Sequence, residues 1–208
     1  AAEKRYPKRD GVIMFPTTHD ITLKNLPVAL AVLRKNLEKG NRVLIVSKPR
    51  LFCIGQLCEG LKGFKDRIMF RFTIGSLDEK VCRFWEPGAP GPFERVRALR
   101  YAYFKGFNTS VSMEPMMEDM VNTAATFNVL KIYVSDKVWI GKMNKPRQRV
   151  RITGPEVAAA VERIEREQKD EEIIRLYGFL KDEPKVAWKD SIREVVRRSG
   201  LMREEIPG

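Results

Sequence analysis

Polar residues that could bind a charged small molecule follow each of five short apolar segments of the chain. These clusters supply hydroxyls, two lysines, two carboxylates, an amide and an imidazole. Lysine attracts a carboxylate or a phosphate as a point charge, and serine or asparagine can hydrogen-bond ribose hydroxyls or the edge of a base. A site built from them would suit a molecule with both anionic and cationic groups. The candidate residues are Thr18, His19, Asp20, Ser47, Lys48, Ser76, Ser112, Glu114, Lys142 and Asn144.

Helix capping is an alternative role for residues in two of these clusters. Ser76 could cap the short helix that follows it, with Glu79 as its capping-box partner. Asp20 or Thr22 could cap the helix that begins near residue 26. Capping by Ser76 would not prevent its side chain from also contacting a ligand.

Other candidate residues have structural alternatives as well. His19 is the only histidine of the chain, and a lone loop histidine is more often a hydrogen-bonded structural residue than a catalyst. Glu114 and Lys142 could form an ion pair with each other. Trp85 and Trp139 are expected to belong to the core rather than to serve as stacking platforms.

The five apolar segments are predicted to be strands with helices between them, a pattern typical of parallel βαβ units with right-handed crossovers. Parallel α/β folds bind ligands at the C-terminal ends of their strands, which is where the polar clusters lie. Sandwiches with helices on both faces and (β/α) barrels share this pattern. Strands are expected at 11–15, 42–47, 67–74, 108–113 and 137–141, with helices at 26–39, 51–61, 77–84, 92–106 and 118–128.

The C-terminal part of the chain differs in composition from the rest. From Thr153 onward the sequence is polar, strongly charged and helical in pattern. We therefore expect an α/β domain over residues 1–150 and a helical extension over 151–208 that packs on it. The helices of the extension are predicted at 154–168, 170–181 and 189–200.

The formal net charge of +12 favours an anionic partner such as nucleic acid. The alternative is that the lysines and arginines only make the surface soluble, since they are spread along the whole chain. The N-terminal residues lack the apolar core of a signal peptide, and no apolar run approaches the roughly 20 residues that span a bilayer. We expect a cytoplasmic protein without a membrane partner.

The cysteines Cys53, Cys58 and Cys82 predict neither a disulfide nor a metal site. Their number is odd, and a reducing compartment disfavours disulfides. Cys53 and Cys58 lie about 140° apart around the axis of an expected helix, so they would not converge on one metal. All three are interpreted as small buried hydrophobic residues. The sequence also has no phosphate-binding glycine loop, nucleophile elbow or zinc-ligand spacing.

Several segments together resemble the radical S-adenosylmethionine superfamily, and within it the branch of spore photoproduct lyase. The resemblance covers most of residues 11–144 and is most specific around the third strand. The segments that carry it are MFPTTHDIT (14–22), VSKPRL (46–51), MFRFTIGS (69–76), FWEPGAPGPFERVRALRYAYFKGF (84–107) and SVSMEP (110–115).

This resemblance implies a partial (β/α) barrel with about five of the six parallel strands of the superfamily, and S-adenosylmethionine bound at their C-terminal ends. Lys48 would lie near the methionine carboxylate of that cofactor. Ser76 would contact the cofactor, and the glycine before it would let the cofactor approach the backbone closely. We infer that Glu114, Lys142 and Asn144 also line the site.

Two features depart from the family pattern. Thr17 stands where the lyase has its hydrogen-donating cysteine, which argues against thymine-dimer repair by the lyase's own mechanism. The CxxxCxxC loop that holds a [4Fe–4S] cluster after the first barrel strand is also absent, and segment 11–15 corresponds to the second strand. We therefore expect a fragment of a longer enzyme, inactive alone, whose cluster depends on an upstream motif.

The expected function is the core of a radical S-adenosylmethionine enzyme. The alternative is a nucleic-acid-binding or otherwise non-catalytic relative that uses the same barrel. A different parallel α/β enzyme, such as a phosphate-handling barrel, is less favoured because the chain has no anion-binding glycine loop.

Overall fold

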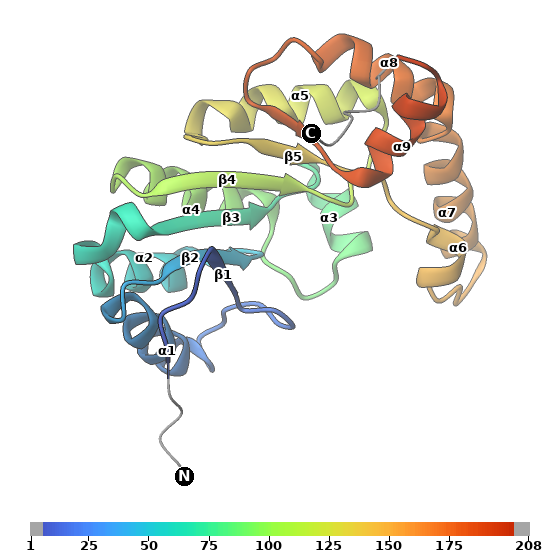
Figure 1. Ribbon diagram of the computed structural model, residues 1–208. Helices are drawn as coiled ribbons and strands as arrows, with labels where there is room; N and C mark the ends of the chain where they lie inside the picture. Colours follow the sequence, from blue (N-terminus) through green and yellow to red (C-terminus); the bar gives the residue numbers. More distant parts are fainter. Residues whose placement is uncertain (1–5, 202–208) are drawn as a thin grey trace. The chain divides into compact units, whose positions relative to one another are not determined.

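A computed structural model describes residues 6–201, and strands alternate with helices along the chain (Figure 1). The strands are β1 (Val12–Phe15), β2 (Arg42–Ser47), β3 (Ile68–Thr73), β4 (Asn108–Met113), β5 (Val138–Ile140) and β6 (Val186–Trp188). The helices between β1 and β5 are α1 (Leu26–Glu38), α2 (Leu51–Gly60), α3 (Glu79–Trp85), α4 (Pro92–Phe104) and α5 (Met120–Leu130). The later helices are α6 (Pro146–Arg149), α7 (Pro155–Glu167), α8 (Asp170–Leu180) and α9 (Asp190–Arg198). Two short 3₁₀ helices are η1 (Lys62–Arg67) and η2 (Lys131–Tyr133).

The six strands form one parallel sheet in the order β1-β2-β3-β4-β5-β6. Register is given by pairs such as Met14 with Leu44, Leu44 with Met69, and Trp139 with Ala187. The strands lie in the sheet in the order of the sequence, and a helical connection follows each of the first strands. This arrangement confirms the expected fold class, an α/β fold that forms a partial (β/α) barrel.

The C-terminal extension was expected to be entirely helical. It also contains strand β6, which belongs to the sheet. This strand has three residues, and its main chain pairs in parallel with β5. A segment of three residues is too short to show the two-residue periodicity that identifies a strand in sequence.

The chain divides into two compact units that alternate along the sequence. The first unit comprises 1–74, 88–111 and 133–136, and the second comprises 75–87, 112–132 and 137–208. These units differ from the two expected domains, 1–150 and 151–208. The expected domain boundary stays a prediction.

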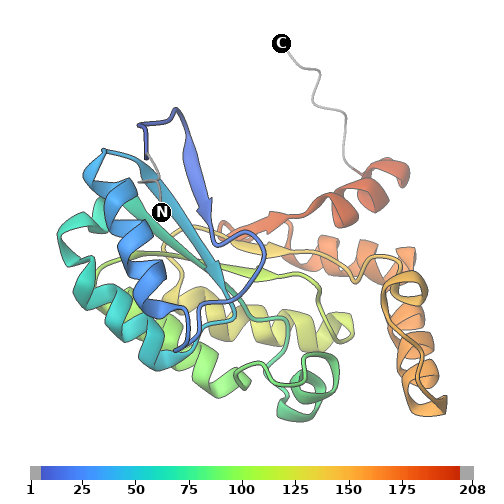
Figure 2. The same cartoon turned by 90° about the horizontal axis from the view of Figure 1, so that it is seen from below.

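The core of the first unit lies between its strands and the helices α1, α2 and α4, which line one face of those strands (Figure 2). Side chains alternate along β2 and β3, so Val43, Ile45, Phe70 and Phe72 are fully buried. The rings of Phe70 and Phe72 have centroids 5.4 Å apart. Burial of each such side chain contributes about 1.5–3 kcal/mol to stability.

Helix α1 begins and ends as its sequence predicts, but its cap differs from the expectation. Proline occupies the first turn, and Gly40 has φ +82° just beyond the end, a conformation that favours glycine. The N-cap residue is Asn25, so the prediction of Asp20 or Thr22 as the cap is wrong. The Asn25 side chain instead accepts a hydrogen bond from the backbone N–H of Thr22 at 2.7 Å.

The proline-rich loop after α3 is held to β3 by a buried arginine. Arg95 is 1% exposed. Its guanidinium donates to the carbonyl oxygens of Pro90 at 2.7 Å and Thr73 at 3.2 Å. These bonds join the loop, the first turn of α4 and the end of β3, all within the first unit.

In the second unit, helix α3 is capped by Asp78 and not by Ser76. The Asp78 carboxylate accepts hydrogen bonds from the backbone N–H groups of Lys80 at 2.7 Å and Val81 at 3.0 Å. The capping prediction placed the helix start two residues too early. Helix α5 is capped in the same way by Asp119.

The helices of the C-terminal extension each bury one apolar face. The buried residues of these helices recur three or four positions apart, which is the spacing of one helical face. They are Val161 and Ile164 in α7, Ile173, Leu176 and Leu180 in α8, and Ile192, Val195 and Val196 in α9.

All three cysteines are buried, as predicted. Within residues 6–201, no helix has both the length and the apolar composition needed to cross a bilayer.

Candidate functional site

The first unit brings together three of the predicted site residues, Asp20, Ser47 and Lys48. The Asp20 carboxylate accepts hydrogen bonds from the Lys48 backbone N–H at 2.7 Å and from the Ser47 hydroxyl at 3.1 Å. The Lys48 ammonium lies 3.9 Å from the same carboxylate. Ser47 Oγ also accepts from the backbone N–H of Ile21 at 3.1 Å. The loop after β1 is thereby fastened to the end of β2.

This group leaves a cation and an anion partly accessible to solvent. The side chains of Lys48 and Asp20 are 29% and 38% exposed. Thr17, Thr18 and His19 precede them in an exposed loop, where the Thr18 hydroxyl lies 3.3 Å from His19 Nδ1. The arrangement can accept hydrogen bonds from an ammonium or hydroxyl and attract a carboxylate.

In the second unit, Ser76 is fully buried and has partners within the protein. Its hydroxyl accepts from the Asp78 backbone N–H at 2.9 Å and is hydrogen-bonded to the Glu118 carboxyl. Its carbonyl accepts from the Cys82 thiol at 3.4 Å. The side chain therefore orders its own loop, and its predicted cofactor contact stays a prediction.

Gly75 faces protein atoms at close range. A Cβ atom at this position would collide with the carbonyl oxygen of Pro115 and would lie 2.8 Å from Met117 Cε. The absence of a side chain thus lets the segment after β4 pack against the backbone of Gly75. This packing accounts for the glycine without a cofactor.

Glu118 was not predicted as a site residue. Burial raises the pKa of its carboxyl, while the hydrogen bond with Ser76 lowers it. The nearby Asp78 and Asp119 carboxylates raise the pKa further, and Arg163 lowers it. The sequence predicts Glu118 at the start of a helix, and nothing in that pattern indicates a buried carboxyl.

Glu114 forms an ion pair with Lys189, so the predicted pairing with Lys142 is wrong. The distance from Glu114 Oε2 to Lys189 Nζ is 3.1 Å, and both side chains are about one-third exposed. Lys189 directly follows β6, and its ammonium lies 5.8 Å from the centroid of the Trp139 ring. Lys189 was missed because β6 was not predicted.

Lys142 is held in the loop after β5. Its ammonium lies 3.8 Å from the carboxylate of Asp170, and its backbone N–H donates to the Ser191 hydroxyl at 3.1 Å. Asn144 is half-buried in the same loop. Ser112 is buried within β4.

Gln168, a further residue that the sequence analysis missed, joins two strand-end loops of the second unit. Its buried amide accepts from the Met143 backbone N–H at 2.8 Å and donates to the Met116 carbonyl at 2.9 Å. It fixes the loop after β5 against the segment after β4.

Both predicted core tryptophans, Trp85 and Trp139, are half-buried with buried Nε1 atoms.

The cysteines do not fit an iron–sulfur cluster. Burial raises the pKa of the Cys58 thiol to about 12 and also raises the pKa of Cys53. Cluster ligands are thiolates, which these environments disfavour. In the described part of the chain, no three His, Cys, Asp or Glu side chains come together as a possible metal site.

The chain was compared with known families and proteins. No model of a known family matches it. Among curated proteins it is similar to the uncharacterized protein ORF301 of Acidianus two-tailed virus, with 31% identity over 106 residues. That match covers 50% of this chain and 35% of the viral protein.

Among solved structures the chain is similar to SuiB of Streptococcus suis. The structure of SuiB bound to S-adenosylmethionine matches with TM-score 0.55 and 14% identity over 77% of this chain and 35% of SuiB. Another structure of SuiB matches with TM-score 0.56 and 13% identity over the same shares. SuiB bound to its precursor peptide SuiA matches with TM-score 0.53 and 12% identity over 95% of this chain and 52% of that one.

The likeness to SuiB shows that the two proteins share an α/β fold over the matched residues. This fold agrees with the class that the sequence resemblance implied. The chain spans about a third to a half of the length of the proteins that it matches.

Proposed function

We propose that this chain binds S-adenosylmethionine at the carboxyl ends of its strands, as part of a radical S-adenosylmethionine protein. The observation that carries the proposal is the fold likeness to SuiB, one structure of which contains S-adenosylmethionine. The motifs that resemble the spore photoproduct lyase branch point to the same cofactor, although Thr17 disfavours the lyase's own reaction.

The chemistry of the strand ends suits this ligand. S-adenosylmethionine carries a carboxylate, an ammonium, a sulfonium and ribose hydroxyls, so a site for it needs both signs of charge. In the second unit, Glu114 and Lys189 supply a carboxylate and an ammonium 3.1 Å apart, and Lys142 and Asn144 lie in the neighbouring loop. Glu114 would accept from the ligand's ammonium or hydroxyls, and a lysine would attract its carboxylate.

In the first unit, the group of Asp20, Ser47 and Lys48 offers the same two charges. Because Asp20 already binds the Lys48 backbone, its carboxylate is fixed in position before a ligand arrives. Lys48 matches the lysine that the lyase places near the methionine carboxylate, and we assign it that role.

The described residues do not fit a [4Fe–4S] cluster, so radical generation is not assigned to this chain. When an enzyme of this type holds its cluster, the cluster supplies the electron that cleaves S-adenosylmethionine. The contribution proposed for this chain is to bind and orient that molecule.

Isothermal titration calorimetry of the purified chain with S-adenosylmethionine tests the proposal. We expect saturable binding that weakens about tenfold, equivalent to about 1.4 kcal/mol, in at least one of the variants Glu114→Gln and Lys48→Met. Glu59→Gln is a matched control, since this carboxylate pairs with Lys105 on the helical surface of the first unit. A folded chain that gives no heat and no nuclear magnetic resonance shifts at its strand ends would overturn the proposal, as would binding unaffected by both substitutions.

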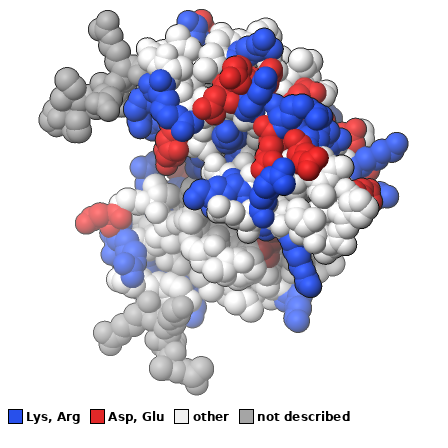
Figure 3. Space-filling view, turned by 90° about the vertical axis from the view of Figure 1, so that its right-hand side faces the viewer, with Lys and Arg blue, Asp and Glu red and all other residues white. Residues whose placement is uncertain are grey.

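Nucleic-acid binding is a second candidate that rests on the net charge of +12. On the face shown in Figure 3, however, basic side chains lie among acidic ones. Arg147 pairs with Glu165 at 2.8 Å, and Arg198 pairs with Asp170 at 2.8 Å. Duplex affinity that falls steeply with salt would favour this candidate, whereas no duplex binding at low salt would remove it.

A further inference from the structure

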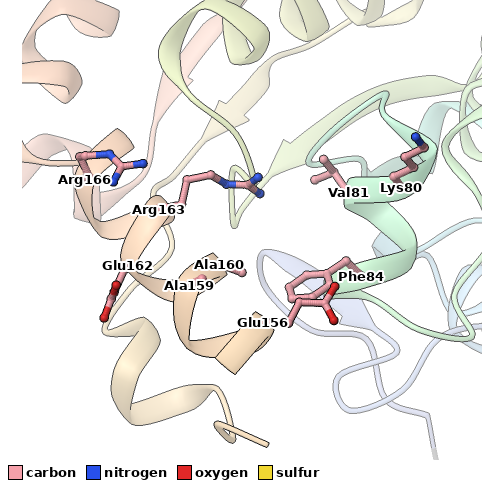
Figure 4. Close-up of a pocket in the computed structure, with 9 residues that line it drawn as sticks. All are labelled: Lys80, Val81, Phe84, Glu156, Ala159, Ala160, Glu162, Arg163 and Arg166. Carbon is pink, nitrogen blue, oxygen red and sulfur yellow. The ribbon is translucent and has the colours of Figure 1, made fainter. Parts of the chain in front are cut away.

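A second possible binding site lies between helices α3 and α7, both in the second unit (Figure 4). The pocket has a volume of about 610 Å³, within the roughly 300–1,000 Å³ that is usual for small-molecule sites. None of its lining residues belongs to the strand-end groups described above. They are Lys80, Val81, Phe84, Glu156, Ala159, Ala160, Glu162, Arg163 and Arg166.

The pocket is lined by apolar side chains at its base. Helix α3 supplies Val81 and Phe84, and the Phe84 ring extends toward α7 in Figure 4. Helix α7 supplies Ala159 and Ala160, which share one helical face with Arg163. The space exists because the residues of α7 opposite Phe84 are alanines, the smallest side chains that keep a helix stable.

Three cations, Lys80, Arg163 and Arg166, and two carboxylates, Glu156 and Glu162, line this pocket. Arg163 extends from α7 toward α3 (Figure 4). Its Nε lies 3.8 Å from the Glu167 carboxylate, and its charge also lowers the pKa of the nearby Glu118 carboxyl. Within residues 6–201, Lys80 and Arg166 have no carboxylate oxygen within 4 Å. Glu162 points away from α3 in Figure 4 and is 3.9 Å from Arg147.

We propose that this pocket binds an organic anion with an aromatic or aliphatic body. The paired Nη groups of Arg163 form a planar fork that matches a carboxylate or a phosphate. The apolar base would cover the body of the molecule, and Lys80 and Arg166 would add charge at the rim. The shared chemistry is an oxyanion on an apolar group, and Glu156 adds one acceptor for a polar substituent.

Four naphthalene compounds of matched size test this proposal by calorimetry and nuclear magnetic resonance on the full chain. They are 2-naphthoate, 2-naphthyl phosphate, neutral 2-naphthalenemethanol and cationic 2-naphthylmethylamine. We expect at least one of the two anions to bind about tenfold or more tightly than the alcohol and the amine. Comparison of naphthoate with naphthyl phosphate identifies which oxyanion the pocket prefers.

Two substitutions and a control locate the binding. Arg163→Gln and Ala159→Glu alter exposed positions. Arg163→Gln should weaken binding of the anion about tenfold with little effect on the alcohol, whereas Ala159→Glu fills the apolar base and should weaken binding of both. Arg197→Gln removes the same charge from the exposed surface of α9, in the same unit, and should change nothing. Circular dichroism verifies that each variant is folded.

Three results would overturn the proposal. The first is no binding of either anion, and the second is an alcohol or amine that binds as tightly as the anions. The third is anion binding that Arg163→Gln and Arg197→Gln weaken equally, since this would reflect net charge rather than the pocket. S-adenosylmethionine binding is measured separately, so failure here leaves the strand-end proposal to its own test.

Discussion

Glu114 and Lys189 lie immediately after β4 and β6, and their charged atoms are 3.1 Å apart. Because both side chains are partly exposed, their pairing should contribute only about 0.2–1 kcal/mol to stability. A double-mutant cycle with Glu114→Gln and Lys189→Met, measured by urea unfolding, should give a coupling energy in this range. The coupling should shrink at 1 M salt relative to low salt, because salt screens exposed charges. Zero coupling at low salt would contradict the ion pair.

Gly75→Ala should destabilise the protein by about 1–3 kcal/mol, because the added methyl group meets the backbone of Pro115, which cannot rotate away. Gly55→Ala is the control, since nothing lies within 4 Å of a Cβ in the middle of α2. That change should stabilise the protein by about 0.5–1 kcal/mol through helix propensity. Chemical unfolding of both variants measures the difference, and equal stabilities would be inconsistent with the packing described for Gly75.

Arg95→Met should lower the free energy of unfolding by about 2–4 kcal/mol, because the carbonyls of Pro90 and Thr73 lose their donor. Faster proteolysis within residues 86–91 is also expected, since this arginine holds the loop. Arg97→Gln changes an exposed residue on the same helix, and its free energy of unfolding should stay within about 0.5 kcal/mol of that of the parent protein. A stable Arg95→Met with an unchanged proteolytic pattern would show that the buried guanidinium is dispensable.

Glu118→Gln should stabilise the protein at neutral pH. Burial raises the pKa of this carboxyl above its usual value of 4.5, so the folded state binds its proton more tightly than the unfolded state does. The stability from this group is fully present below pH 4.5 and is lost as pH rises through the folded-state pKa. The amide avoids that loss, with a gain below about 1 kcal/mol because the site is partly solvated.

The free energy of unfolding of Glu118→Gln and of the parent protein, measured at pH 4 and at pH 7, tests this prediction. The gain of Glu118→Gln over the parent protein should be larger at pH 7. Glu194→Gln, on the exposed surface of α9, should stay within about 0.5 kcal/mol of the parent at both values. A larger gain at pH 4 would reverse the assigned direction of the pKa shift.

The fold was predictable because its strands carry strong local signals. Segment 42–47 is a short, mainly apolar run followed by polar residues, and the structure has a strand with these bounds. Helix α1 likewise has proline in its first turn and Gly40 beyond its end. Strand β6 has no such signal, since three residues acquire their conformation by pairing with β5.

The site was less predictable because partners are chosen by tertiary packing. Asp20, Ser47 and Lys48 lie at the ends of adjacent strands, as the sequence predicts, and the structure brings these three into contact. The partner of Glu114 lies 75 positions away in a segment that had not been predicted as a strand. Ser76 and Asp78 are both good caps, and only backbone geometry distinguishes them.

The position of β6 at the end of the sheet makes the C-terminal extension the cover of β5. The main chain of Val186–Trp188 covers the hydrogen-bonding groups along one side of β5. Without it, that side would be a bare template for intermolecular strand addition. Cutting the chain back at residue 150 would therefore make β5 the edge strand in place of β6, and would also remove the helices that bury an apolar face, α7, α8 and α9.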